Sequence, residues 1–304
     1  MEETSPASRT VAEAALQAAS LVAAMPRLVL EARRIASSVA HGLHGRRRAG
    51  AGENFWQYRR FLGGEPAARV DWRRSARDDH LYVREREWEA AHTVWIWPDL
   101  SASMDYATAN HPRKRERALV IAFALADLLV RGGERVGMPG LMPPSANRNI
   151  VERMAENLVL APALPASLPP LFTPAPTSEL VLLGDFWSPA DEVAARIAAL
   201  GSSGAHGHVV QIVDPAEETF PFSGRIEFAD PEGGEKLTVG RAESWRSDYE
   251  MKLEAHRARL RAAAERHGWS FIVHRTDQPA SALLLNLHMR MGVGGPALAM
   301  GGRA

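Results

Sequence analysis

The sequence predicts an α/β protein in which a mostly parallel sheet carries helices on both faces. Apolar, β-branched runs of strand length recur along the chain, at 93–97, 135–141, 179–184, 207–213 and 269–274. Between them lie longer segments with the apolar period of amphipathic helices, at 113–131, 148–158, 189–200 and 243–267. Strands that alternate with helices form βαβ units, whose parallel strands are covered on both faces.

Further elements precede and interrupt this pattern. An Ala-rich helical segment is expected to break at Pro26, because proline disrupts a helix interior. A second helix is expected at 27–40, with inward-facing residues Leu28, Leu30 and Ile35. The irregular Arg-rich stretch that follows predicts short strands such as 81–84, and 225–239 predicts a β-hairpin. We therefore expect four parts: a flexible or helical segment at 1–26, a helix and Arg-rich β-extension at 27–92, the α/β domain at 93–290, and a flexible tail at 291–304.

Composition excludes several classes of function. The 36 basic and 36 acidic residues balance, so no global field favours nucleic acid or a membrane surface. The absence of cysteine excludes disulfides, thiol catalysis and thiolate metal sites. No apolar run approaches the ~20 residues of a transmembrane helix. The first nine residues are polar and acidic, unlike a signal peptide, so a cytoplasmic protein is expected.

Small oxygen-bearing side chains follow two of the expected strands. Asp99, Ser101 and Ser103 stand at alternate positions after 93–97, and Asp185 ends the run 179–184. The carboxyl ends of parallel strands meet at the edge where α/β sheets bind ligands. Carboxylates and hydroxyls are ligands that suit Mg²⁺. The sequence therefore predicts a Mg²⁺ site made of Asp99, Ser101, Ser103 and Asp185. In the alternative interpretation, Asp99 and the serines only cap the following helix and its turn.

The motif Asp-Leu-Ser-Ala-Ser-Met at 99–104 resembles the D-x-S-x-S signature of the von Willebrand factor A domain. In that family the loop forms a metal-ion-dependent adhesion site, completed by a threonine in a second loop and an aspartate at a later strand end. Asp185 matches this aspartate. The threonine has no counterpart in the stretch PPSANRNIVERM, which offers Ser145, Asn147 and Asn149 instead.

The segment 53–89 resembles the signature of the bacterial DUF58 family, whose members contain a von Willebrand factor A-like domain. The matching positions are the aromatic and arginine stretch 55–61, Gly64-Glu65, Val70-Asp71-Trp72, Ser75-Ala76-Arg77, and Leu81 with Val83-Arg84-Glu85. The resemblance covers roughly 27–290. It implies a non-enzymatic adaptor or chaperone-like role in complex assembly or metal-cofactor maturation. The implied partners are a MoxR-type AAA+ ATPase and other von Willebrand A proteins.

The residues of segment 53–89 also predict a structural role without reference to the family. Its arginines alternate with carboxylates around Trp72 and Tyr82. This pattern predicts a structural network of Arg–carboxylate pairs that pack on aromatic rings.

Other functions remain as alternatives. A phosphatase could use Asp99 as nucleophile, but Ser101 stands where that chemistry needs a second carboxylic acid for proton transfer. A purely structural scaffold with a vestigial metal site is also consistent with the residues. The three arginines 46–48 are few beside the phosphate contacts of a strong nucleic-acid binder. The chain lacks the G-x-S-x-G, phosphate-loop and H-E-x-x-H motifs, so no catalytic residue is expected.

Overall fold

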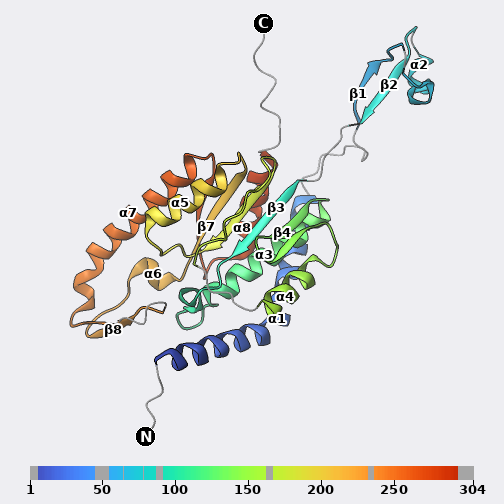
Figure 1. Ribbon diagram of the computed structural model, residues 1–304. Coiled ribbons are helices and arrows are strands. Elements are labelled where there is room, and N and C mark those ends of the chain that lie inside the picture. Colours follow the sequence, from blue (N-terminus) through green and yellow to red (C-terminus); the bar gives the residue numbers. More distant parts are fainter. Residues whose placement is uncertain are drawn as a thin grey trace. The chain divides into compact units, whose positions relative to one another are not determined.

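The computed structural model of the chain describes residues 6–44, 55–63, 65–77, 79–86, 92–161, 167–231 and 236–293 (Figure 1). The chain divides into a large unit, Met1–Gly42 with His92–Ala304, and a small unit, Leu43–Ala91. The N-terminal helix therefore belongs to the large unit, whereas the sequence groups it with the Arg-rich extension. Gly64, the arginines 46–48 and the expected tail from 294 onward lie outside the described residues.

Six strands form the central sheet of the large unit, in the order β10-β7-β6-β3-β4-β5. Their bounds are β3 Thr93–Pro98, β4 Arg135–Met138, β5 Met142–Ser145, β6 Glu179–Gly184, β7 His206–Val213 and β10 Ser270–Arg275. All neighbours pair in parallel except β4 and β5. Counted along the chain, this is the 3-2-1-4-5-6 order of doubly wound sheets. The predicted mostly parallel sheet is therefore confirmed, and its order reverses between β3 and β6.

The antiparallel strand β5 is an element that the sequence conceals. We expected one strand over 135–141, but the chain turns after β4 and returns as β5. Two prolines, Pro143 and Pro144, stand in β5 and hide it from a strand pattern. They are tolerated because β5 is an edge strand whose pairing with β4 is irregular between Val136 and Met138, and proline occurs in sheets at edges and bulges.

Helices cover both faces of the sheet (Figure 1). Their bounds are α3 Lys114–Arg131, α4 Ile150–Leu160, α5 Ala190–Gly201, α6 Pro215–Thr219, α7 Arg246–Glu265 and α8 Ala280–Val293. On one face, α5 and α7 pack against β6 and β7 through buried Leu180, Val193, Val209 and Leu260. On the other face, α3 contacts β3, α4 and α8. Every residue from 118 to 130 of α3 is buried, so this helix lies at the centre of its layer.

The first helix, α1 Pro6–His44, runs through Pro26, so the expected break is wrong. A proline in a helix interior costs roughly 3 kcal/mol, because it removes one hydrogen bond and crowds the preceding turn. Tertiary packing offsets this cost through a stripe of buried side chains, Leu21, Met25, Leu28, Ala32, Ala36 and Val39. Ion pairs join Arg27 to Glu116 of α3 and Arg33 to Glu152 of α4. Leu28 is buried as predicted, whereas Leu30 is 64% exposed.

Several signature residues stabilise the local structure of the small unit. It contains β1 Phe55–Arg60, η1 Ala67–Arg69, α2 Trp72–Ser75 and β2 Tyr82–Arg86, with β1 and β2 antiparallel. Asp71 caps α2 by accepting from the Arg74 backbone N–H at 2.9 Å. The hydroxyl of Ser75 donates to the Asp71 carbonyl and accepts from the Tyr82 N–H, both at 2.8 Å. The Arg74 guanidinium lies 4.7 Å from the Tyr82 ring centre, which confirms the packing of an arginine on an aromatic ring, and Trp72 is 62% exposed. The Arg–carboxylate pairs stay a prediction.

The expected hairpin over 225–239 is present as β8 Ile226–Ala229 and β9 Lys236–Val239, which pair antiparallel. Most of its turn, residues 232–235, lies outside the described residues. Among the helices that the structure describes, none has the length and apolar character needed to cross a bilayer.

Candidate functional site

Three neighbouring strands end in buried aspartates at the carboxyl edge of the sheet. Asp99 follows β3, Asp185 follows β6 and Asp214 follows β7, and each is at most 1% exposed. The Asp99 N–H donates to the Leu183 carbonyl at 2.7 Å, which joins the first loop to β6. Sequence reasoning identified Asp99 and Asp185 but missed Asp214. The run Val-Val-Gln-Ile-Val-Asp at 209–214 has the same apolar-then-acid pattern and could have indicated it.

The loop after β3 brings Asp99, Ser101 and Ser103 together, as the motif predicts. Asp99 Oδ1 accepts from the Ser101 N–H at 2.8 Å, and the hydroxyls of Ser101 and Ser103 are 3.2 Å apart. The loop continues as the short helix η2 Ala102–Asp105. A Cβ on Gly184 would lie only 3.1 Å from Asp99 Oδ2, so the Asp99 side chain packs against the residue that precedes Asp185.

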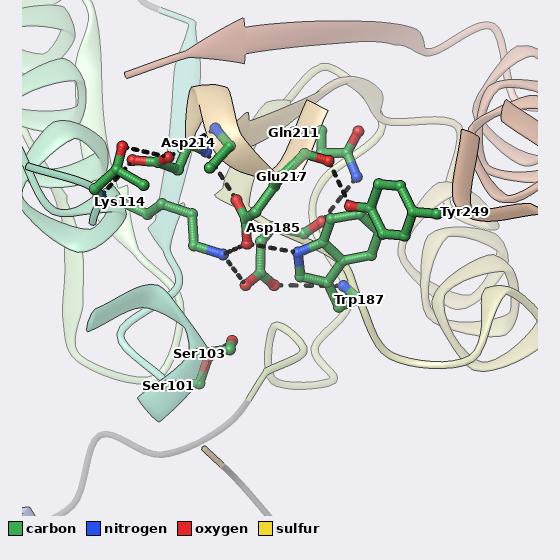
Figure 2. Close-up of polar contacts among 11 residues, drawn as sticks. Ser101, Ser103, Lys114, Asp185, Trp187, Gln211, Asp214, Glu217 and Tyr249 are labelled. Carbon is green, nitrogen blue, oxygen red and sulfur yellow. Dashed lines mark hydrogen bonds and ion pairs between the residues drawn. The ribbon is translucent and has the colours of Figure 1, made fainter. Parts of the chain in front are cut away.

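Asp185 has a lysine as its partner. The ammonium of Lys114, the first residue of α3, lies 2.9 Å from Asp185 Oδ2 and 2.6 Å from Glu217 Oε1. Figure 2 shows the ammonium between these two carboxylates, with Ser101 and Ser103 outside this network. Sequence reasoning missed both Lys114 and Glu217. Only three of the 36 basic residues are lysines, and this scarcity could have drawn attention to Lys114.

Burial and neighbouring carboxylates shift the pKa values of four groups at this edge. Burial, the largest single influence, lowers the pKa of Lys114, but the carboxylates of Asp185 and Glu217 together raise it above its ordinary value. Burial raises the pKa of Glu217, while Lys114 opposes that change. Burial and then Glu217 raise the pKa of Tyr249 to about 12. The pKa of Tyr106 is likewise raised by burial, and next by Asp214 and Glu217. Burial therefore penalises charge of either sign at this edge, and the carboxylates of Asp185 and Glu217 offset that penalty for the ammonium of Lys114.

The backbone beside Asp185 is strained. Phe186 has a φ of +53°, in the left-handed region that a bulky residue rarely adopts. Such strain persists only where surrounding contacts impose it, and it concentrates at functional sites. Here the contacts are a Gln211 side chain that donates to the Asp185 carbonyl at 3.0 Å and His256, which bonds the Phe186 carbonyl at 2.8 Å. Trp187 completes the group by donating from its indole to Glu217 Oε1 at 3.3 Å.

Asp214 binds the segment that follows the serine loop, which is the loop after β3 that carries Ser101 and Ser103. Its carboxylate accepts from the Thr108 N–H at 2.9 Å and from the Thr108 hydroxyl at 2.7 Å. Two arginines that flank Lys114 contact the end of the same loop: Arg113 and Arg115 both pair with Asp105, at 2.5 and 3.0 Å. The start of α3 and the end of β7 therefore position this loop from two sides.

The donor set fits a hard cation in part. Asp99, Ser101 and Ser103 supply oxygens from one loop, which is the ligand chemistry of Mg²⁺. Asp185 is shared with Lys114. Across the described ranges, no group of three or more histidines, cysteines, aspartates or glutamates could hold a metal ion, so a site here depends on the serine hydroxyls.

The residues offered in place of the threonine make a turn of their own. The hydroxyl of Ser145 accepts from the Asn147 N–H at 3.3 Å and from Arg153 at 3.0 Å. Asn147 in turn accepts from the Asn149 N–H at 2.8 Å. These bonds lie in the turn that leads into α4, and none of them joins the three residues to the loop of Ser101 and Ser103.

Replacing Gly184 with alanine is expected to displace the Asp99 carboxylate. The added Cβ would lie 3.0 Å from Asp99 Cβ, closer than ordinary contact. Overpacking of this kind costs about 1–3 kcal/mol. Chemical denaturation would measure the loss against Gly240→Ala, where an added Cβ has nothing within 4 Å. Equal stability of the two variants would show that Asp99 does not depend on this close contact.

Comparison with known proteins places the chain in a family without an assigned function. Residues 57–259 match the family model described as "Protein of unknown function DUF58". Uncharacterised proteins Mb1516 of Mycobacterium bovis and MT1527 and Rv1480 of Mycobacterium tuberculosis are each 26% identical over 280 residues. These matches cover 85% of this chain and 86% of each relative.

Two solved structures show a more distant similarity. One is an aerotolerance-related membrane protein from Bacteroides fragilis, at 19% identity and a TM-score of 0.42. The other is the conserved hypothetical protein BatB from Bacteroides thetaiotaomicron, at 15% identity and a TM-score of 0.38. Each match covers 67% of this chain and the whole of the other chain, but these scores are too low to inform function. The family model spans most of the chain, from the signature of the small unit to α7, and the chain therefore belongs to the DUF58 family.

Proposed function

We propose that this chain is a non-enzymatic protein-interaction module that binds its partner at the carboxyl edge of the sheet. The observation that supports the proposal is a cation held in the interior of that edge. Lys114 is 1% exposed, and its ammonium contacts the carboxylates of Asp185 and Glu217. Burying an ammonium is costly unless the surrounding charge compensates it. The carboxylates of Asp185 and Glu217 therefore stabilise a buried positive charge at this edge.

The same edge offers ligands for a divalent cation. Asp99, Ser101 and Ser103 would hold Mg²⁺, and Asp185 would contribute directly or through water. When bound, the ion would offer an open coordination position to a carboxylate of a partner protein. Family resemblance suggests a MoxR-type AAA+ ATPase as that partner, and a cytoplasmic location belongs to the same proposal.

Affinity capture from the native lysate tests this function. The baits are the wild-type chain, Asp99→Ala and the surface control Glu254→Ala, whose side chain is 70% exposed on α7. Each is used with Mg²⁺ and with EDTA, and bound proteins are identified by mass spectrometry. We expect a partner that is retained by the wild type and Glu254→Ala in Mg²⁺ and lost in EDTA. Asp99→Ala is expected to lose the partner under both conditions.

Other outcomes would favour the alternatives. A partner that remains bound under every condition would contradict a metal-dependent site and support a structural scaffold. Mg²⁺-dependent hydrolysis of an aryl phosphate, abolished by Asp99→Asn, would support a phosphatase. The structure provides no carboxylic acid two residues after Asp99, where that reaction needs a proton donor, because Ser101 occupies the position.

A further inference from the structure

Lys114 is unusual among the basic residues of this chain. Lysine side chains normally keep the ammonium in water, yet this one is 1% exposed and points inward from the first turn of α3. Arg113 and Arg115 on either side pair instead with Asp105. Only the middle one of these three consecutive cations contacts the carboxylates of Asp185 and Glu217.

The chemistry of the side chain suits this position. An ammonium is a compact point charge with three rotatable donors, whereas a planar guanidinium needs a wider site. Two of the donors of Lys114 are satisfied by carboxylates, Asp185 directly after β6 and Glu217 in α6. Lys114 therefore compensates the charge of one carboxylate at a strand end and one in a helix without any other ion.

Asp185 is a candidate partner for two different cations. It contacts the ammonium of Lys114, and it is also a member of the oxygen set proposed for a divalent cation. A divalent cation that approaches Asp185 would meet a buried positive charge at the same carboxylate. The ammonium of Lys114 and the divalent cation would repel each other strongly, because the effective dielectric constant of a buried site is low.

We propose that Lys114 is the resident counter-ion of this edge and competes with a divalent cation for Asp185. This inference rests on the proposed function of the site. The chain then folds without metal, because the ammonium stabilises the two carboxylates. It binds a divalent cation weakly until a partner supplies a further carboxylate, so metal and partner are taken up together.

The test compares full-length wild type with Lys114→Met, which keeps the length of the side chain and removes its charge. The control is Lys252→Met, an exposed lysine on α7. Calorimetric titration with Mg²⁺ measures affinity, and thermal melts in Mg²⁺ and in EDTA measure stability. We expect Lys114→Met to bind Mg²⁺ at least tenfold more tightly than the wild type. Its Tm should fall in EDTA and recover with Mg²⁺, whereas the wild type and Lys252→Met should change little.

Further variants separate this inference from the proposed function. If wild type and Lys114→Met bind Mg²⁺ with equal affinity, Lys114 does not compete and the inference is wrong, although the metal site stands. If the double variant Lys114→Met with Asp99→Ala keeps the tenfold gain in Mg²⁺ affinity, the competition between Lys114 and the ion is supported. The proposed ligand set is then wrong, because Asp99 is not needed. If Lys114→Met does not fold, the pair Lys114→Met with Glu217→Gln removes one carboxylate along with the ammonium. That double variant should still show the tenfold gain, and unchanged affinity would overturn the inference.

Discussion

Asp214→Ala is expected to lower the free energy of unfolding by about 3 kcal/mol. The carboxylate of Asp214 is fully buried and accepts three hydrogen bonds, two from Thr108 and one from the Ala216 N–H at 2.9 Å. Loss of a helix N-cap costs about 1 kcal/mol, and each buried donor left without an acceptor costs roughly 1–3 kcal/mol. The Asp214 N–H also donates to Glu217 Oε2 at 2.8 Å, and alanine keeps this N–H, so the expected loss comes from the Asp214 side chain alone.

Urea denaturation would measure this loss. Asp214→Asn is expected to lie between wild type and Asp214→Ala, because it keeps one acceptor oxygen but turns an amide group toward Thr108. Asp191→Ala is the matched control, since Asp191 stands in the first turn of α5 and its side chain is 88% exposed. An Asp214→Ala midpoint equal to that of the control would show that β7 does not position the serine loop.

Acidification is expected to destabilise the protein through His274 on β10. The side chain is 5% exposed, and burial, followed by the charge of Arg117, lowers its pKa to about 4, against the opposing effect of Asp277. In the unfolded chain the pKa is about 6.5. The unfolded state therefore binds a proton between these values while the folded state does not. The stabilisation is complete above about pH 6.5 and is lost as the pH falls toward 4, at a total cost of about 3 kcal/mol.

The free energy of unfolding, measured at pH values from 7 to 4, tests this slope. His274→Phe keeps a flat ring and removes the titration, so its stability should fall less steeply over that window than that of the wild type. The control is His206→Gln, an exposed histidine at the start of β7, which should keep the wild-type slope. Parallel curves for wild type and His274→Phe would show that other groups control the acid sensitivity.

Local signals account for much of what could be predicted about the fold. The run 179–184 marks β6 because a parallel strand covered on both faces is apolar at nearly every position, as this run is. Element β5 escaped prediction because its two prolines contradict a strand unless its place at the sheet edge is known. The continuous helix α1 escaped prediction because its partners lie far along the chain, as the ion pairs of Arg27 with Glu116 of α3 and of Arg33 with Glu152 of α4 show.

The candidate site divides in the same way. The sequence alone determined that Asp99, Ser101, Ser103 and Asp185 stand at strand ends, because the distance from an apolar run to the next polar residue is a local property. It could not determine what meets Asp185, since Lys114 is 71 residues away and Glu217 is 103 residues from Lys114. Only the packing of α3 against the ends of β6 and β7 decided that an ammonium occupies this edge. Such contacts depend on the three-dimensional order of the strands, and that order is not encoded in any local pattern.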